Sequence, residues 1–223
     1  EVYFRYEKDG ADILRGLNLQ VKHGELLAVL GGNGAGKSTQ IDVIEETLRA
    51  RGLEVIRTRE PGGTPLGEVI RKELLSVSMD PSTETLLFFA SRAEHIAKVI
   101  RPAIERGAWV LSDRFTDATY AYQVGGRGFP AHKVEELERW TQGDLQPDRT
   151  VLFDIEPEVA AERVARARNL DRFEKENLDF FKRVRQAYLT RANQSPNRFL
   201  IVNSMQDKDT VSAILRKEFS TWA

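Results

Sequence analysis

The chain has 223 residues, enough for one α/β domain with a full core, and its 41% hydrophobic and 30% charged residues are typical of a globular protein. Acidic and basic residues nearly cancel to a net charge of −1, so no overall field attracts nucleic acid or anionic membranes. The lack of cysteine excludes disulfides, thiolate metal sites and thiol nucleophiles. No apolar stretch approaches the ~20 residues that span a bilayer. We therefore expect a cytoplasmic protein without a membrane or nucleic-acid partner.

The first 24 residues differ in pattern from the rest of the chain. Residues 2–7 alternate apolar and polar side chains, Lys8-Asp9-Gly10 is a turn signal, and residues 17–22 alternate again. This pattern predicts an antiparallel β-hairpin over residues 1–24, which we expect to be separate from a domain formed by residues 25–223.

Residues 25–223 alternate between short apolar runs and helical patterns. We expect strands at 25–30, 54–58, 109–112, 150–154 and 199–202. Helices are expected at 39–49, 66–75, 83–106, 131–142, 157–168, 177–193 and 209–219. Such alternation is typical of a parallel sheet covered by helices on both faces, which is a three-layer α/β fold.

A glycine-rich loop follows the first of these strands and precedes the first helix. The residues Gly31-Gly32-Asn33-Gly34-Ala35-Gly36-Lys37-Ser38 match the P-loop pattern G-x-x-x-x-G-K-[ST]. The glycines let successive N–H groups point at phosphate oxygens, Lys37 supplies a positive charge, and Ser38 offers a hydroxyl ligand to Mg²⁺. We expect these residues and Thr39 to bind ATP. The alternative is a chance glycine-rich turn, which the position between strand and helix disfavours.

A second polar site is expected at the end of the strand 109–112. Asp113 directly follows this strand, and the carboxyl edge of a parallel sheet is where such folds bind ligands. Asp113 is a candidate ligand for Mg²⁺ or its waters, and Arg114 could hold phosphate in a bidentate fork. The alternative is a surface salt bridge at a strand end.

From Gln40 to the C-terminus the chain resembles thymidylate kinases. The resemblance rests on six ordered motifs: Thr58-Arg59-Glu60-Pro61-Gly62-Gly63-Thr64, Phe88-Phe89-Ala90-Ser91-Arg92, Asp113-Arg114-Phe115 with Ala121-Tyr122-Gln123, Gly125-Gly126-Arg127-Gly128, Asp154 with Pro157-Glu158, and the stretch from Arg166 to Glu174. It implies a P-loop NTPase fold and transfer of the ATP γ-phosphoryl group to dTMP with Mg²⁺.

The same resemblance implies roles for individual residues. Arg59 and Arg114 would hold the acceptor phosphate, Phe88 would stack on the base, and Arg92 would donate to a base carbonyl. Thr119, Tyr122 and Gln123 would line the nucleoside pocket. Arg166 and Arg168, with Arg163 and Arg172, would form an arginine-bearing lid over ATP. The alternatives are a core role for Phe88 and a solvated helix face for the arginines. The resemblance also implies a homodimer, to which the helix 83–106 would contribute.

Residues 1–39 instead resemble the start of an ABC-transporter ATPase. The matching text is Phe4-Arg5-Tyr6, Ile13-Leu14-Arg15-Gly16-Leu17, Gly24-Glu25-Leu26-Leu27-Ala28-Val29 and the loop itself. In that family the aromatic corresponding to Tyr6 stacks on adenine. The later ABC signature is absent after Thr39, so we expect a hybrid joined within Gly36-Lys37-Ser38-Thr39.

Two positions of the loop region depart from the kinase pattern. Thymidylate kinases usually carry acidic residues where this chain has Leu30 and Asn33. Three functions follow: a dTMP kinase, a hybrid nucleotide-binding protein with weak or no turnover, and an ABC-type motor fragment. The acceptor-site motifs favour the first over the third, and the altered loop is what favours the second.

Overall fold

A central sheet of five parallel strands organises the molecule. The computed structural model describes residues 2–4, 14–17, 24–165 and 172–222. The strands lie in the order β4-β5-β3-β6-β7 and pair in parallel throughout. Their bounds are β3 Leu26–Gly31, β4 Val55–Arg59, β5 Trp109–Asp113, β6 Arg149–Asp154 and β7 Phe199–Asn203. Each bound lies within one residue of the expected strand, which confirms the α/β assignment.

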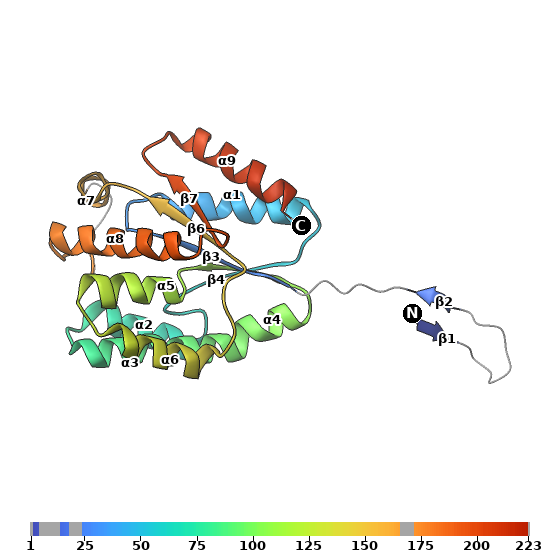
Figure 1. Cartoon of the computed structure of the whole chain (residues 1–223), viewed down its shortest axis with the longest axis horizontal. Helices are drawn as coiled ribbons and strands as arrows, with labels where there is room; N and C mark the ends of the chain where they lie inside the picture. Colours follow the sequence, from blue (N-terminus) through green and yellow to red (C-terminus); the bar gives the residue numbers. More distant parts are fainter. Residues whose placement is uncertain (1, 5–13, 18–23, 166–171, 223) are drawn as a thin grey trace.

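Helices connect the strands and cover both faces of the sheet (Figure 1). Their bounds are α1 Lys37–Ala50, α2 Pro65–Ser76, α3 Pro81–His95, α4 Arg101–Glu105, α5 Thr116–Thr119, α6 Ala131–Gln142, α7 Pro157–Ala165, α8 Leu178–Gln194 and α9 Lys208–Thr221. Two π-helical segments, η1 Ile96–Ile100 and η2 Tyr120–Gly126, continue α3 and α5.

The sequence pattern did not predict one of these helices, and it predicted another as a single uninterrupted helix. The expected helix 83–106 is a continuous run of α3, η1 and α4. The helix formed by α5 and η2 was not expected, because threonine, tyrosine and paired glycines have low helix propensity. It forms where η2 packs along α8, so tertiary contact outweighs local preference. Residues 166–168 of the expected helix 157–168 lie outside the described residues.

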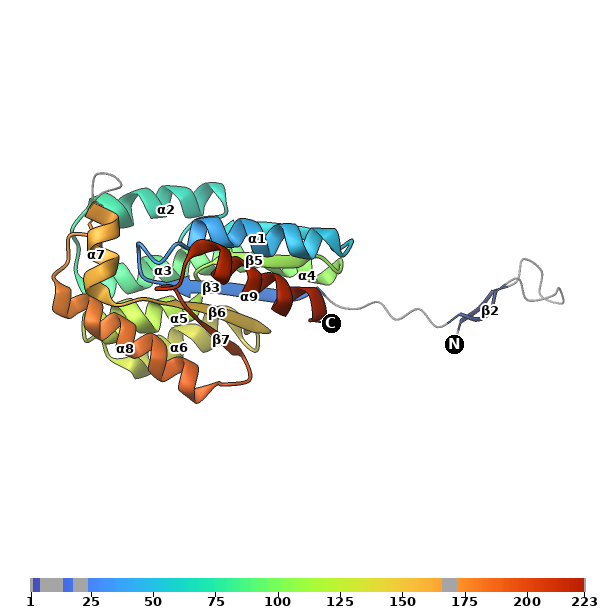
Figure 2. The same cartoon turned by 90° about the horizontal axis from the view of Figure 1, so that it is seen from above.

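Alternating side chains of β3 divide the core into two layers. Leu27 and Val29 pack with α1 and α9, which contact each other on one face of the sheet. Leu26 and Ala28 face the side of η1 and α4, and Leu30 faces η2 and α8. Figure 1 shows α1 and α9 above the sheet, with α2, α3, α5 and α6 below it, and Figure 2, seen from above, shows α9 in front of β3. The sheet and the helical layers on its two faces therefore meet around β3, the strand that leads into the glycine-rich loop.

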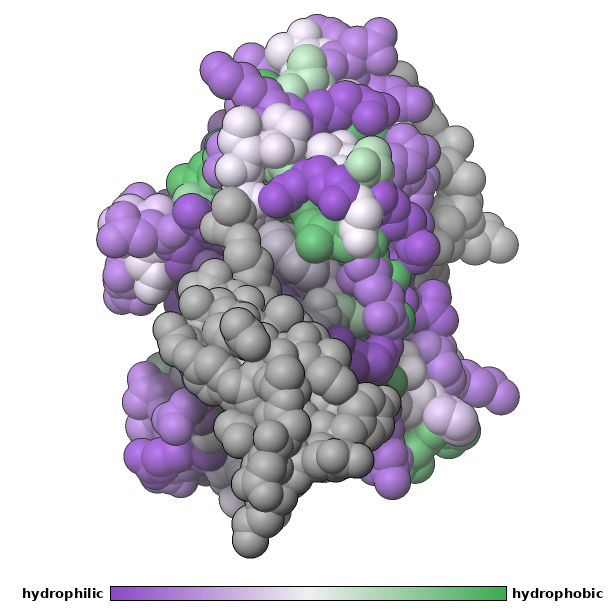
Figure 3. Space-filling view, turned by 90° about the vertical axis from the view of Figure 1, so that its right-hand side faces the viewer, coloured by the Kyte–Doolittle hydropathy of each residue, from purple (hydrophilic) through white to green (hydrophobic). Residues whose placement is uncertain are grey.

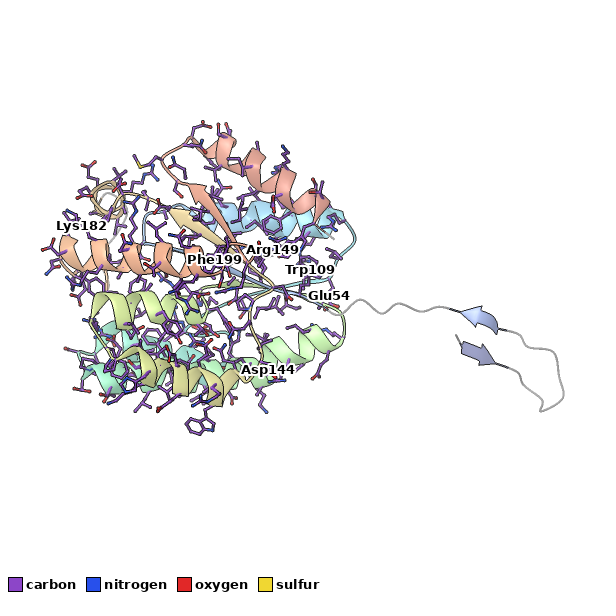
Figure 4. The ribbon with its side chains drawn as sticks, in the orientation of Figure 1. Glu54, Trp109, Asp144, Arg149, Lys182 and Phe199 are labelled. Carbon is purple, nitrogen blue, oxygen red and sulfur yellow. The ribbon has the colours of Figure 1, made fainter. Side chains whose placement is uncertain are left out.

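The two ends of the sheet differ in character. At the amino end, Trp109 packs edge-on against Trp222 with ring centroids 5.0 Å apart, and Arg149 lies over the Trp222 ring. Figure 4 shows Glu54, Trp109 and Arg149 toward this end, and Lys182 of α8 at the opposite side. Where described residues are visible in Figure 3, this end is mostly hydrophilic with small hydrophobic patches.

The N-terminal residues are described only in part. Strands β1 Val2–Phe4 and β2 Leu14–Leu17 pair antiparallel. The expected turn at residues 8–10 and most of the expected second strand at 17–22 lie outside the described residues. Within the described part of the chain, every helix falls short of the length and apolar character needed to cross a bilayer.

Candidate functional site

The glycine-rich loop connects β3 to α1 at the carboxyl edge of the sheet. Gly34 adopts a φ of +84°, and a Cβ there would lie 2.6 Å from the Ala160 carbonyl oxygen. Gly31 adopts a φ of +143°, and its Cβ would lie 2.7 Å from the Phe153 oxygen. Only glycine fits at either position. Helix α1 begins at Lys37, so the positive end of its dipole faces the loop and favours an anion there.

Lys37 lies folded under its own loop. Its side chain is 8% exposed, and Nζ donates to the carbonyl oxygens of Gly31 at 3.0 Å and Gly32 at 3.1 Å. Burial and the neighbouring Arg114 lower the pKa of Lys37 to about 8, although Asp113 and Glu174 act in the opposite direction. The ammonium group therefore lacks a full counter-charge, and a phosphate group would supply one.

Asp113 and Arg114 end the neighbouring strand β5. In the sheet register, Asp113 lies beside Val29 of β3 and Arg59 of β4. Its Oδ1 atom is buried and has no hydrogen-bond partner among the described residues. Arg114 adopts a left-handed φ of 73°, and its N–H donates to the Val29 carbonyl oxygen. A non-glycine residue in this region is costly, and such strain concentrates at functional sites.

The oxygen atoms near Lys37 suit a hard cation only in part. The Ser38 hydroxyl is exposed at the start of α1, and the free Asp113 Oδ1 lies across the loop. In the described part of the chain, no three acidic, histidine or cysteine side chains gather as a metal site. This donor set fits Mg²⁺, which usually takes one or two protein oxygens and completes its shell with phosphate and water.

Asn33 joins two charged groups across the loop. Its Nδ2 donates to Glu174 Oε1 at 2.8 Å, and its Oδ1 accepts from Arg114 Nη2 at 2.8 Å. The Arg114 guanidinium also lies 4.8 Å above the Tyr122 ring and donates to its hydroxyl. A side chain at position 33 must therefore both donate and accept to keep these contacts, and an amide does so while a carboxylate only accepts.

One cavity of about 550 Å³ joins the loop to the helices below the sheet. All seven residues expected to bind the acceptor line it, together with much of the loop: Asn33, Gly34, Gly36, Lys37, Ser38, Thr39, Arg59, Phe88, Arg92, Asp113, Arg114, Thr119, Tyr122 and Gln123. Gly31, Gly32 and Ala35 are not part of this lining, and Gly31 and Gly32 line a neighbouring cavity instead. The structure thus brings together two groups of residues that are up to 90 positions apart in the chain.

An aromatic and polar wall closes the lower part of the cavity. Phe88 is half-buried, with its ring centroid 6.1 Å from that of Phe173, while Phe89 is buried in a separate core cluster. Arg92 is 2% exposed and donates to Thr119 Oγ1 at 3.0 Å. Gln123 donates to the buried Glu84 at 2.9 Å. Phe88 therefore contributes both to the core and to the cavity wall.

A cluster of cations lies between this wall and the loop. Arg59 pairs with Glu68 at 2.7 Å. Arg71 of α2 also lines the cavity and donates to the Pro61 carbonyl oxygen at 3.0 Å. Burial, followed by the charges of Arg59 and Arg114, lowers the pKa of Arg71. Three arginines that repel one another indicate a place for an anion.

Sequence reasoning missed Arg71 and also His95, to which no role was assigned. Helical spacing could have found Arg71: it lies three residues after Glu68, and both side chains contact the turn that follows Arg59. His95 is fully buried and bonds to Glu60, which no pattern of histidine spacing would reveal. His132 is exposed, and His23 lies outside the described residues.

The expected lid is described only at its two ends. Arg166 and Arg168 lie outside the described residues. Arg163 lines the cavity and donates to the Ser204 carbonyl oxygen at 3.2 Å. Arg172 is placed differently from Arg163, because it pairs with Glu84 of α3 and donates to the Leu74 carbonyl oxygen. Its guanidinium is thereby held against α2 and α3.

Comparison with known proteins identifies the family. The thymidylate kinase family model matches residues 29–214. A thymidylate kinase of Methylobacillus flagellatus is 55% identical over 188 residues, covering 84% of this chain and 93% of the relative. One from Cupriavidus necator is 53% identical over 200 residues, covering 89% and 98%. The chain belongs to the thymidylate kinase family.

The comparisons do not support the expected hybrid. The family match begins at Val29, so the whole glycine-rich loop lies inside the thymidylate kinase match rather than in an ABC-ATPase segment. The relatives named above are thymidylate kinases, and nothing in these comparisons supports an ABC-ATPase origin for residues 1–39 or a join within Gly36-Lys37-Ser38-Thr39. The glycine-rich loop is a poor guide to the family, because P-loop proteins of different families share this sequence to bind phosphate through backbone N–H groups.

Replacing Lys37 with methionine should stabilise the ligand-free protein at pH 7 by roughly 1–2 kcal/mol. The pKa of about 8, against 10.5 for a free lysine, corresponds to a cost of about 3 kcal/mol for the buried charge. Losing the two hydrogen bonds to loop carbonyls offsets about 1 kcal/mol each. Urea unfolding of the parent and of Lys37→Met measures the difference.

The effect must depend on pH with a defined sign. Below pH 8 lysine is protonated in both states, so the cost to the folded state is complete; it falls as pH rises toward 10.5. The advantage of Lys37→Met should therefore shrink over that range. Lys72→Met, at an exposed lysine, is the control and should have little effect at either pH. A loss of stability in Lys37→Met at pH 7 would contradict the proposed cost of burying the Lys37 charge.

Proposed function

We propose that the protein transfers the γ-phosphoryl group of ATP to dTMP, giving dTDP and ADP. The observation that carries this proposal is the single cavity of about 550 Å³ in which the phosphate loop, a buried lysine and an arginine-rich acceptor wall face one another. Membership of the thymidylate kinase family supports the same reaction. The two substrates would meet between Lys37 and Arg114.

ATP would bind along residues 31–39. Backbone N–H groups of the loop and the amino end of α1 would hold its phosphates, and Lys37 would leave the Gly31 and Gly32 carbonyls to contact the transferring group. Ser38 and Asp113 would hold Mg²⁺ or its waters through the exposed hydroxyl and the free Oδ1. Bound Mg²⁺ would neutralise charge on the phosphoryl oxygens.

dTMP would bind on the opposite wall. Arg59, Arg71 and Arg114 would surround its phosphate, which removes the repulsion that lowers the pKa of Arg71. Phe88 would stack on the base and Arg92 would donate to a base carbonyl. Thr119, Tyr122 and Gln123 would line the nucleoside pocket, as their positions on the cavity wall support.

The transfer would proceed in line, without a covalent enzyme intermediate. Little covalent chemistry is required of the protein in phosphoryl transfer, so catalysis rests on positioning and charge stabilisation. Lys37 and Arg114 would stabilise the developing charge, with Arg166 and Arg168 completing the set. Asn33 would hold Arg114 in place through its 2.8 Å contact.

Weak turnover is a second candidate, favoured by the same Asn33. The amide ties Glu174 and Arg114 together without adding charge, where related kinases usually have a carboxylate. In that case the protein would bind both nucleotides and transfer phosphate slowly.

We also propose three features that rest on the family resemblance. The enzyme would use Mg²⁺ as cofactor, act in the cytoplasm where both nucleotides are present, and form a homodimer through helices beside the sheet. Exposed apolar side chains on adjacent helices support the dimer: Leu66 and Val69 on α2, Leu86 on α3 and Trp140 on α6. Sedimentation that finds only monomers at working concentrations would exclude it.

Residues 1–24 would form a separate unit before the kinase domain of residues 25–223. We propose a β-hairpin here, supported by the antiparallel pairing of β1 with β2 and by the start of the family match at Val29. The kinase domain holds its own nucleotide cavity, so the hairpin would have no part in binding ATP.

ADP formation should require both dTMP and Mg²⁺. The donor at Arg92 and the amide of Gln123 suit a pyrimidine with ring carbonyls, so dTMP should be preferred over dCMP, AMP and GMP. A coupled assay for ADP, run with each acceptor and with EDTA, measures this. Equal turnover with AMP, or ATP hydrolysis indifferent to dTMP, would refute the proposed reaction.

Changing Asn33 to aspartate should alter kcat/KM for dTMP by less than about threefold, although the family pattern alone suggests a larger gain. The new carboxylate strengthens the contact with Arg114, but it lies beside the buried Glu174 and loses the donor. Adding Glu174→Gln restores a donor at that position. The double variant should gain about tenfold over the single one, the difference between a charge-assisted and a neutral hydrogen bond.

Steady-state kinetics of the parent, both single variants and the double variant form a complete cycle. If Asn33→Asp alone is tenfold faster than the parent, the amide bridge to Glu174 has no bearing on the rate.

Replacing Tyr6, which lies outside the described residues, should leave ATP affinity unchanged within about twofold. An aromatic stack on adenine contributes roughly 1 kcal/mol or more. Calorimetric titration of Tyr6→Ala with an ATP analogue measures the change, and Tyr3→Ala provides the matched control. A tenfold loss of affinity confined to Tyr6→Ala would show that the hairpin contacts the nucleotide.

A further inference from the structure

A buried network of charged side chains lies directly behind the acceptor wall. The Glu60 carboxylate accepts from Arg92 Nε at 2.7 Å and bonds to His95 Nδ1 at 2.9 Å. His95 Nε2 lies 2.6 Å from Thr58 Oγ1. Glu60, Arg92 and His95 are 3%, 2% and 0% exposed. Burying charged groups costs desolvation free energy, which their mutual attraction only partly offsets. The network therefore needs an explanation other than stability.

The network leaves one nitrogen of Arg92, Nη1, without a hydrogen-bond partner among the described residues. Its Nε is held by Glu60 and its Nη2 by Thr119, while the guanidinium carbon lies 4.8 Å from the Phe89 ring centroid. Nη1 is buried and has no partner among the described residues, and Arg92 is part of the cavity wall. A planar guanidinium fixed at two nitrogens has no freedom to redirect the third.

Glu60 and His95 determine each other's orientation. Because an ionised carboxylate only accepts hydrogen bonds, the shared proton lies on His95 Nδ1. Burial favours the protonated acid, but the charge of Arg92 and the hydrogen bond of His95 together hold the pKa of Glu60 below its usual value. Glu60 is therefore ionised, and it presents one oxygen to each partner.

We propose that Glu60 and His95 are positioning residues that aim Arg92 Nη1 at a carbonyl oxygen of the acceptor base. This inference rests on the proposed dTMP kinase function and adds a source for its base selectivity. A fixed N–H donor pairs with the ring carbonyl of thymine and opposes the exocyclic amino group that cytosine has at the equivalent place.

The same network sets the spacing between base and phosphate recognition. Arg59 directly precedes Glu60, and the following turn is held to α3 because Gly62 N–H donates to Ser91 Oγ at 3.2 Å. A Cβ on Gly63 would lie 2.6 Å from both His95 Nε2 and Thr58 Oγ1, so this turn packs directly on the histidine. Arg59 and Arg92 are thus parts of one rigid assembly.

A pair of histidine substitutions separates positioning from packing. Asparagine places its amide where Nδ1 lies and keeps a donor to Glu60, whereas glutamine places its amide near Nε2 and does not. His95→Gln and Glu60→Gln should each lower kcat/KM for dTMP by about tenfold to a hundredfold, the range for one charge-assisted hydrogen bond. The KM for dTMP should carry most of the loss, and the KM for ATP should stay within about twofold.

The preference for dTMP over dCMP supplies the deciding measurement. It should fall by about tenfold in Glu60→Gln and His95→Gln and should be largely restored in His95→Asn. Asp117→Asn is the matched control, because Asp117 is a buried acid that pairs with Arg191 and Arg198 and does not itself line the cavity. That variant should lose stability and keep the substrate preference of the parent.

The outcomes distinguish this inference from the proposed function. A parent protein without dTMP-dependent ADP formation would refute the function itself. If the parent is active and His95→Gln and His95→Asn show the same dTMP:dCMP preference, the positioning role is overturned, whether or not Glu60→Gln folds. An equal loss of the dTMP:dCMP preference in Asp117→Asn would likewise show that the network acts only on the stability of the fold.

Discussion

The burial of Lys37 under the glycine-rich loop is the constraint on which the rest of the site depends. Within the described part of the chain its ammonium group donates to two loop carbonyls, and its lowered pKa reflects burial and the nearby Arg114. The loop takes this shape because Gly31 and Gly34 occupy backbone conformations that exclude side chains. A protein that holds a cation in this way gains stability when an anion binds, since phosphate supplies the missing counter-charge. Nucleotide binding is therefore built into the energetics of the ligand-free loop.

Around Lys37 the parallel sheet gathers basic and acidic side chains at one edge. The register of β3, β4 and β5 places Val29, Arg59 and Asp113 at the same level of the carboxyl edge. Arg71 and Arg114 approach from α2 and from the end of β5, and their mutual repulsion shows in the lowered pKa of Arg71. Two phosphate groups with Mg²⁺ would balance this excess of positive charge. The cation cluster would attract the phosphate groups, and the Asp113 oxygen that lacks a partner among the described residues would attract Mg²⁺.

Below that edge, two buried acids fix side chains of the cavity wall and of the helices behind it. Glu60 holds Arg92, and Glu84 holds Gln123, Arg127 and Arg172. Buried ion pairs of this kind contribute little net stability, because the desolvation cost offsets most of the attraction. Their effect here is on orientation: Glu60 restricts the rotation of Arg92, and Glu84 restricts that of Gln123, and both of these side chains line the cavity. The proposed selectivity for a carbonyl-bearing base follows from that loss of freedom.

The sequence by itself determined the α/β fold, the five strands to within one residue, and the phosphate loop, since these depend on local periodicity and on glycine. It also indicated the acceptor residues through the thymidylate kinase motifs, and it misassigned residues 29–39 because a phosphate loop has the same chemistry in every family that uses one. Only the tertiary structure decided that η2 forms a helix against α8, that Asn33 bridges Arg114 and Glu174, and that Arg172 turns to Glu84. It also revealed Arg71 and the pairing of His95 with Glu60. Each of these features depends on contacts between residues that are far apart in the chain. The sequence pattern shows the spacing of neighbouring residues, but it does not show which buried groups become partners in the folded protein.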